Sequence, residues 1–174
     1  MDSAEYERKI ASRFATFDQD GSGYIDREDF SVAARAVLAE FGVRARSDKG
    51  QSVFAGAEAF WQGMAGIADV DGDQRVSREE FVTGAVKRLR DNPERFAEIA
   101  RPFLRAVIAA ASDDGSAAGA SPAAATRVLR VLGTPPELAA QIATGLDADG
   151  DGRISEEEIL TAFAGYCGVA APDA

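Results

Sequence analysis

Histidine is absent from this 174-residue chain, cysteine occurs once and methionine twice. Without histidine, the chain lacks the side chain that most often serves as general acid or base near neutral pH. It also offers no nucleophile paired with a base and no glycine-rich phosphate-binding loop. The single Cys167 cannot form an internal disulfide. These absences argue against catalysis, and we expect a protein that is not an enzyme.

Long apolar runs are also missing. The longest, from Ala106 to Ala111, is far too short to cross a bilayer, and the N-terminus has no apolar segment typical of a signal peptide. The net charge of −10 repels nucleic acid and anionic membranes and attracts cations. We therefore expect a soluble, cytoplasmic monomer that binds neither nucleic acid nor membranes.

The most informative stretch is D-A-D-G-D-G-R-I-S-E-E-E, residues 147–158. Acids stand at positions 1, 3, 5 and 12, Gly152 at position 6 and the apolar Ile154 at position 8. This is the full EF-hand calcium-loop signature. Alternating acids on a tight loop point inward, the glycine supplies the positive φ of the turn, and the last glutamate contributes two oxygens.

The pattern occurs twice more, at residues 69–80 and 18–29, with Val76 and Ile25 at position 8. Both copies depart from the signature at ligand or turn positions, and the first loop also has Ser22 at position 5. Gln74 replaces the glycine at position 6, and Asp29 replaces the glutamate at position 12. An internal repeat of a known helix–loop–helix unit is much stronger support for its function than one match.

We expect three Ca²⁺ sites, built from carboxylates and one backbone carbonyl in each loop. The expected ligands are Asp147, Asp149, Asp151, the Arg153 carbonyl and Glu158; Asp69, Asp71, Asp73, the Arg75 carbonyl and Glu80; and Asp18, Asp20, Ser22, the Tyr24 carbonyl, Asp26 and Asp29. Gln74 at positive φ is expected to weaken the second site. The shorter Asp29 makes bidentate binding difficult, which favours six-coordinate geometry and admits Mg²⁺ at the first site.

A fourth, degenerate loop is expected at residues 113–124, where only Asp113 remains as a carboxylate at a ligand position. Ser121-Pro122 marks the start of its exiting helix, and no metal should bind there. Its Ala120 is expected to pair with Ile154 of the last loop.

Apolar residues at helical spacing flank every loop, so the expected fold is all-α. It consists of four EF-hand units in two pairs, with a short two-stranded β pairing between the loops of each pair. The expected domains are residues 1–91 and 92–174, packed into one compact body. Helix starts are expected at capping boxes on Asp48 and Thr134 and at an Asn92-Pro93 cap, with a kink or break near residue 98 caused by Pro102.

This plan resembles the bacterial calerythrins and the sarcoplasmic calcium-binding proteins across roughly residues 5–167. The resemblance implies four hands, long helices in the N-terminal half, a compact body and at least one loop that has lost its ligands. It also implies Ca²⁺ as the bound species.

Two functions stay open at this point. An intracellular Ca²⁺ buffer is favoured, because only Met1 and Met64 are available for the methionine-rich groove of a typical sensor. The alternative is a Ca²⁺ sensor that exposes an apolar groove to a partner protein. A carrier of apolar ligands, as among the four-hand photoproteins, is disfavoured because photoproteins depend on histidine.

Overall fold

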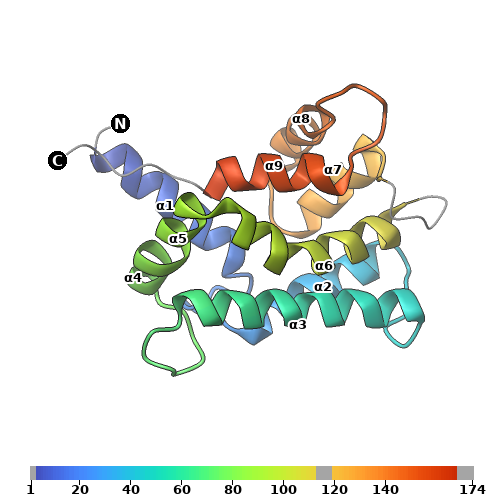
Figure 1. Cartoon of the computed structure of the whole chain (residues 1–174). Coiled ribbons are helices and arrows are strands. Elements are labelled where there is room, and N and C mark those ends of the chain that lie inside the picture. Colours follow the sequence, from blue (N-terminus) through green and yellow to red (C-terminus); the bar gives the residue numbers. More distant parts are fainter. Residues whose placement is uncertain (1–2, 113–118, 168–174) are drawn as a thin grey trace.

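The structure is a computed structural model that describes residues 3–112 and 119–167. Its helices are α1 (Ser3–Phe17), α2 (Arg27–Glu40), α3 (Asp48–Ala68), α4 (Arg78–Glu80), the π-helical segment η1 (Phe81–Val86), α5 (Lys87–Asp91), α6 (Pro93–Ala111), α7 (Pro122–Val131), α8 (Pro136–Leu146) and α9 (Glu156–Cys167). Because α4, η1 and α5 are continuous, the described residues form eight helical stretches (Figure 1). The all-α fold is confirmed, and no described helix is long and apolar enough to cross a membrane.

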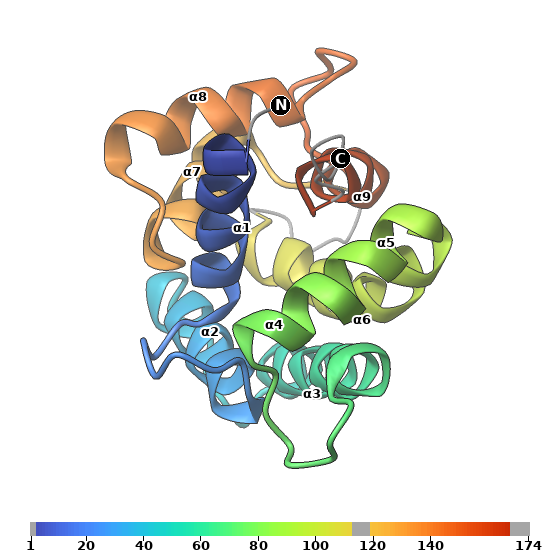
Figure 2. The same cartoon turned by 90° about the vertical axis from the view of Figure 1, so that its left-hand side faces the viewer.

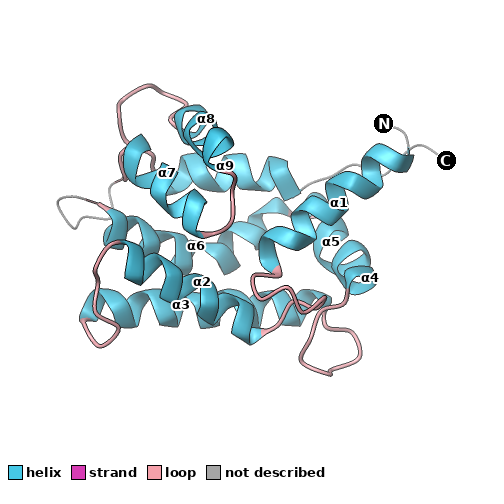
Figure 3. Cartoon of the chain, turned by 180° about the vertical axis from the view of Figure 1, so that it is seen from behind, coloured by secondary structure: helices cyan, strands magenta, loops and turns pink. Residues whose placement is uncertain are grey.

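The expected β pairing is present only as single bridges. Ile25 and Val76 exchange two backbone hydrogen bonds of 2.9 and 2.7 Å, and Ala120 and Ile154 exchange two of 3.0 and 2.7 Å. Both bridges are antiparallel, and no strand forms among the described residues (Figure 3). One residue from each loop suffices to join the first loop to the second and the degenerate loop to the last.

The helix starts agree in part with the sequence. The Asn92 and Ser121 side chains accept hydrogen bonds from Arg95 and Ala124, as their positions before Pro93 and Pro122 indicated. The third helix is capped one residue earlier than expected, by Ser47. The prediction of a capping box at Thr134 is wrong, because α8 begins after Pro135 without a side-chain cap.

A kink or break was expected near residue 98; the break is wrong, because α6 runs unbroken past Pro102 to Ala111, and the kink stays a prediction. A proline inside a helix removes one hydrogen bond, and close packing against a neighbour can offset that loss. Helix α3 lies alongside α6 and supplies this packing (Figure 1). At Gly56 the two backbones are so close that an added Cβ would lie 2.6 Å from the Cα of Phe103.

One apolar core extends through both halves of the chain. The Phe60 ring of α3 lies 5.9 Å from that of Phe17 in α1, 5.1 Å from that of Phe30 in α2 and 6.2 Å from that of Phe103 in α6. Leu160 of α9 is buried in the same cluster. The contacts of Phe60 therefore cross the expected domain boundary at residues 91 and 92, while the division into two EF-hand domains itself stays a prediction.

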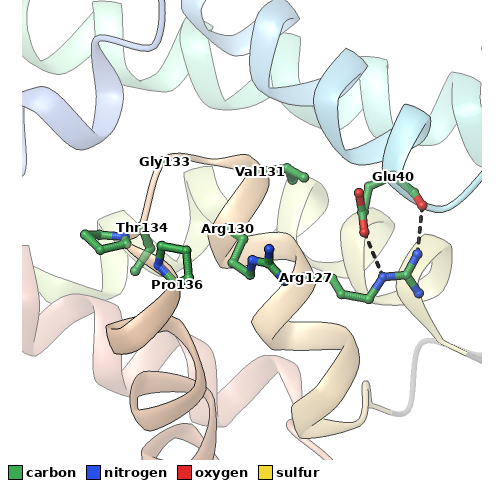
Figure 4. Close-up of a pocket in the computed structure, with 8 residues that line it drawn as sticks. Glu40, Arg127, Arg130, Val131, Gly133, Thr134 and Pro136 are labelled. Carbon is green, nitrogen blue, oxygen red and sulfur yellow. Dashed lines mark hydrogen bonds and ion pairs between the residues drawn. The ribbon is translucent and has the colours of Figure 1, made fainter.

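A polar contact fixes α7, the exiting helix of the degenerate loop, to the end of α2. Arg127 of α7 donates hydrogen bonds of 2.8 Å to both the carboxylate and the backbone carbonyl of Glu40 (Figure 4). Its guanidinium also lies 4.4 Å from the Phe41 ring centroid. Because the last carbonyls of a helix lack intrahelical partners, Arg127 satisfies the end of α2 while holding α7 in place.

We predict that Gly56→Ala destabilises the protein by about 1–3 kcal/mol, because the new Cβ forces α3 and α6 apart. The matched control is Gly66→Ala in the same helix, where an added Cβ meets no atom within 4 Å. That change should stabilise by up to about 1 kcal/mol through helix propensity. Urea denaturation at fixed Ca²⁺ measures both, and equal effects of the two substitutions would contradict the close approach.

Candidate metal centres

The structure gathers the loop acids into three clusters. Within each cluster, one ligand atom per residue lies within 4.8 Å of the others. The clusters are Asp69, Asp71, Asp73 and Glu80; Asp147, Asp149, Asp151 and Glu158; and Asp18, Asp20 and Asp29. Several carboxylates so close together repel one another unless a cation lies between them, and oxygen-rich sites of this kind suit Ca²⁺ and Mg²⁺.

The acid at position 12 organises each loop in the same way. Glu158 accepts hydrogen bonds from the backbone amides of Ala148 at the start of the loop and Ser155 near its end, at 2.6 and 3.0 Å. Glu80 likewise accepts from Val70 at 3.2 Å and Ser77 at 2.9 Å. One carboxylate therefore joins both ends of a loop.

Serine side chains complete these contacts as capping boxes. Ser77 accepts from the Glu80 amide at 3.2 Å, and Ser155 accepts from the Glu158 amide at 3.2 Å. The exiting helix therefore starts on the same two residues that close the loop. The position-12 carboxylate and the first helical turn are therefore one structural unit, and ordering one of them orders the other.

One carboxylate oxygen in the last loop indicates a cation site. Asp147 Oδ1 is buried and has no hydrogen-bond partner within the described structure, whereas its Oδ2 accepts from the Gly152 amide at 3.0 Å. A buried, unpaired carboxylate oxygen costs free energy unless a proton donor or a cation satisfies it. The donor set of this loop fits a divalent cation.

The first loop achieves the same closure with a shorter side chain. Asp29 Oδ1 accepts from the Asp20 amide at 3.0 Å, and Asp29 Oδ2 accepts from the Asp26 amide at 2.8 Å. Asp29 is 1% exposed, whereas Glu80 and Glu158 are half-buried. The aspartate therefore lies deeper in the protein than its counterparts, which the sequence did not indicate.

Two other residues of the first loop make local contacts. Asp26 caps α2 by accepting from the Asp29 amide and is not part of the acidic cluster among the described residues. The Ser22 hydroxyl donates to the Tyr24 carbonyl at 3.0 Å. Their predicted roles as ligands stay predictions, as do those of the Arg75 and Arg153 carbonyls.

Gln74 has the strained backbone expected from its position. Its φ is +63°, and it is the one non-glycine residue with positive φ in the described chain. Gly152, at the same loop position, has φ +81°. The second loop therefore keeps the turn geometry of the last one despite the substitution.

A contact between the first two loops was not anticipated from the sequence. The Arg75 guanidinium lies 4.5 Å from the centroid of the Tyr24 ring. Both residues stand at position 7, directly before the bridge formed by Ile25 and Val76. This cation–π contact adds a side-chain link to the backbone pairing.

Burial and like charge perturb the acids. Burial raises the pKa of Asp29 to about 7, against the backbone hydrogen bonds from Asp20 and Asp26 that lower it. Burial also raises the pKa of Asp69. The Asp151 amide lowers the pKa of Asp149, but burial and the charges of Asp151 and Glu158 together outweigh it and leave the pKa raised. At these three acids the surroundings disfavour the negative charge, whereas the backbone amides of Ser22 and Ser155 lower the pKa of Asp20 and of Glu158.

The first half of the degenerate loop 113–124, including Asp113, lies outside the described residues. Its visible end agrees with the sequence, since Ala120 bridges to Ile154 and α7 starts after Ser121. The expectation that it binds no metal stays a prediction.

We predict that Gln74→Gly stabilises the Ca²⁺-saturated protein by about 1 kcal/mol, because glycine adopts positive φ without the Cβ clash. The reciprocal change, Gly152→Gln, should destabilise by a similar amount. Thermal denaturation at saturating Ca²⁺ measures both. Equal stability of the wild type and Gln74→Gly would show that the second loop carries no such strain.

We predict that Ca²⁺ affinity of the first loop falls about tenfold between pH 8 and pH 6, because binding requires ionised Asp29 and its pKa is about 7. Without divalent ions, the same group should make the folded protein less stable as pH rises from about 4 to 7, since only the folded state retains the proton.

The amide resonance of Gly23, followed by NMR during Ca²⁺ titrations, reports on this loop, and that of Gly152 reports on the last loop in the same sample. Asp29→Asn should remove the stability change that this group causes. An affinity of the first loop that does not vary with pH would contradict the proton linkage.

Comparison with known proteins agrees with this geometry. The EF-hand domain pair matches residues 7–86, and a single EF hand matches residues 146–164. Calerythrin from Saccharopolyspora erythraea is 26% identical over 165 residues, which cover 93% of this chain and 92% of calerythrin.

Solved structures extend the likeness over the whole chain. A calcium-binding protein from Streptomyces coelicolor, studied for prokaryotic calcium-mediated regulation, is 63% identical with a TM-score of 0.91, covering 95% of this chain and 99% of its own. Calcium-loaded apo-aequorin from Aequorea victoria shares the fold at 17% identity and a TM-score of 0.70, covering 99% of this chain and 95% of its own. Repeated acidic loops, capped exit helices and these matches lead to one conclusion: the chain belongs to the EF-hand family of calcium-binding proteins and is calerythrin-like.

Proposed function

We propose that this protein is an intracellular Ca²⁺ buffer, acting as a monomer with three metal-binding hands and one silent hand. The observation that carries the proposal is the set of three carboxylate clusters, each closed by a position-12 acid that also starts a helix. A cation in such a loop removes the repulsion between its carboxylates, so binding should chiefly stabilise the fold.

The last loop should be the strongest site. Asp147, Asp149 and Asp151, the Arg153 carbonyl and a bidentate Glu158 would surround Ca²⁺, and the unpaired Asp147 Oδ1 supports this assignment. The second loop would use the corresponding residues, Asp69, Asp71, Asp73, the Arg75 carbonyl and Glu80.

The first loop should bind through Asp18, Asp20, Ser22, the Tyr24 carbonyl, Asp26 and Asp29, and should also accept Mg²⁺. The short Asp29 side chain is held by backbone amides on both of its oxygens. Such fixed geometry suits the stricter octahedral coordination of Mg²⁺ better than a flexible glutamate does.

A buffer should change shape little, and two contacts support this. The rings around Phe60 join α1, α2, α3 and α6 in one core. In addition, Glu156 at the start of α9 accepts from Arg101 at 2.6 Å and Arg105 at 3.1 Å, both on α6, with its side chain only 12% exposed. Helix α9 lies alongside α6 (Figure 1). The exit helix of the last loop is therefore fixed to the central helix pair.

A Ca²⁺ sensor is the second candidate, favoured by the likeness to the Streptomyces coelicolor protein studied for calcium-mediated regulation. A sensor must expose an apolar groove to a partner protein when Ca²⁺ binds. The paired loops would then transmit binding between hands, and we include in the proposal that the four hands form two pairs, in residues 1–91 and 92–174.

Isothermal titration should give three Ca²⁺ per chain. Asp18→Asn, Asp69→Asn and Asp147→Asn should each remove or strongly weaken one site, because each removes the charge of the position-1 acid. Asp113→Asn in the degenerate loop is the matched control and should leave three sites. A stoichiometry of zero in wild type would overturn the metal-binding function, and a loss on Asp113→Asn would overturn the silent hand.

Spin labels at Gln62 on α3 and Thr161 on α9, both exposed, distinguish buffer from sensor. In a buffer the distance between labels should not change between chelator and Ca²⁺. A shift of several ångströms, which is the scale of helix opening in sensor hands, would favour the sensor.

A further inference from the structure

A cavity of about 640 Å³ lies between the central helices and the hand formed by α7 and α8. Ala15, Thr16 and Phe17 of α1 line one side of it. Figure 2 shows α1 between α8 and α2. Phe30, Phe60 and Phe103 form its inner end, while Leu129, Leu138 and Ile142 form its outer side. Protein interiors are normally close-packed, with few voids larger than a water molecule. A hollow of this size lined by such residues therefore requires an explanation.

The cavity can be reached from solvent. Leu138 and Ile142 on α8 are 46% and 43% exposed, although both are large apolar residues. Exposed apolar side chains that line a hollow are typical of binding sites rather than of ordinary surface.

The volume of about 640 Å³ suits a small molecule. Ligand pockets for small molecules commonly enclose about 300–1,000 Å³.

Two polar residues of the wall, Gln19 and Asp29, belong to the first calcium loop. Gln19 donates from Nε2 to the carbonyls of Thr16 at 2.7 Å and Leu132 at 3.0 Å, so it spans from the loop to the end of α7. Asp29 lines the wall beside it, and a carboxylate accepts more hydrogen bonds than the backbone amides of Asp20 and Asp26 supply. A ligand here should be neutral and mostly apolar, and it should carry a hydrogen-bond donor.

We propose that this cavity binds a neutral, largely apolar small molecule carrying one hydrogen-bond donor, and binds it more tightly when Ca²⁺ occupies the first loop. The coupling rests on the proposed function of that loop. Asp29 belongs both to the acidic cluster and to the cavity wall.

The direction of coupling follows from charge. Asp29 is already buried, and a ligand that fills the cavity replaces the nearby cavity water by apolar surface, which makes an uncompensated carboxylate charge more costly. A Ca²⁺ ion held by the same carboxylate compensates it. The last loop touches the cavity as well, through Ile154 of its β-bridge and Ile159 of α9.

This proposal revises the expectation from the sequence. The absence of histidine bears on light-emitting chemistry, but it has no bearing on whether an apolar cavity holds a ligand. Helical periodicity placed the phenylalanines in the core without showing that the core is hollow.

The probe is N-phenyl-1-naphthylamine, a neutral apolar fluorophore with a single N–H donor. Its titration into the full chain should show saturable fluorescence enhancement, with affinity at least about fivefold higher in Ca²⁺ than in chelator. Asp29→Asn removes the charge, so chelator-state affinity should rise and the Ca²⁺ effect should shrink. Absence of saturable binding would overturn the site, and equal affinity with and without Ca²⁺ would overturn the coupling.

Two variants separate the cavity from the surface. Ala125→Phe on α7 fills the cavity and should reduce probe affinity at least about tenfold, whereas Ala123→Phe, exposed on the same helix, should leave it unchanged. Leu138→Asp places a charge at the exposed rim and should also weaken binding, with little risk to folding. Binding unaffected by both Ala125→Phe and Leu138→Asp would overturn the location.

Calorimetry of the same samples without probe keeps the two proposals apart. If Asp18→Asn changes neither Ca²⁺ stoichiometry nor affinity, the function proposed for the first loop fails. Saturable probe binding that Ala125→Phe weakens would then still establish the cavity as a site.

Discussion

The structure depends on one carboxylate in each loop that closes the loop and starts the next helix. Asp29, Glu80 and Glu158 each accept backbone amides from both ends of their loop. The amide bonds hold these carboxylates in place, and at Asp29 burial opposes the negative charge and raises the pKa. The loops are thus organised around negative charge that only a cation fully offsets.

Much of this arrangement could be predicted from the sequence, because the EF-hand loop is a local structure. Spacing within twelve residues predicted where the exiting helices begin, the positive φ of Gln74 and the acids that gather in each cluster, although it also included Asp26, which caps α2 instead. The bridge between Ala120 and Ile154 followed from loop position alone, even though one loop has lost its carboxylates.

Features that arise between elements could not be predicted in this way. Pro102 indicated a break, yet α6 is continuous, because the close approach at Gly56 is a property of two helices and not of one. The depth of Asp29 and the contact of Arg75 with Tyr24 also result from how the hands pack. The position of the cavity depends on seven of the eight helical stretches together, which periodicity in any one of them does not reveal.

The paired contact between the first two loops has a consequence for how the protein responds to rising Ca²⁺. Ile25 and Val76 share two hydrogen bonds, and the Arg75 guanidinium covers the Tyr24 ring. An ion that rigidifies one loop therefore reduces the conformational entropy that the other loop loses when it binds its own ion. This half of the molecule should fill over a narrower concentration range than two independent sites would. The last loop bridges to Ala120 of a loop with a single acid at a ligand position, and should follow a simple hyperbolic saturation curve.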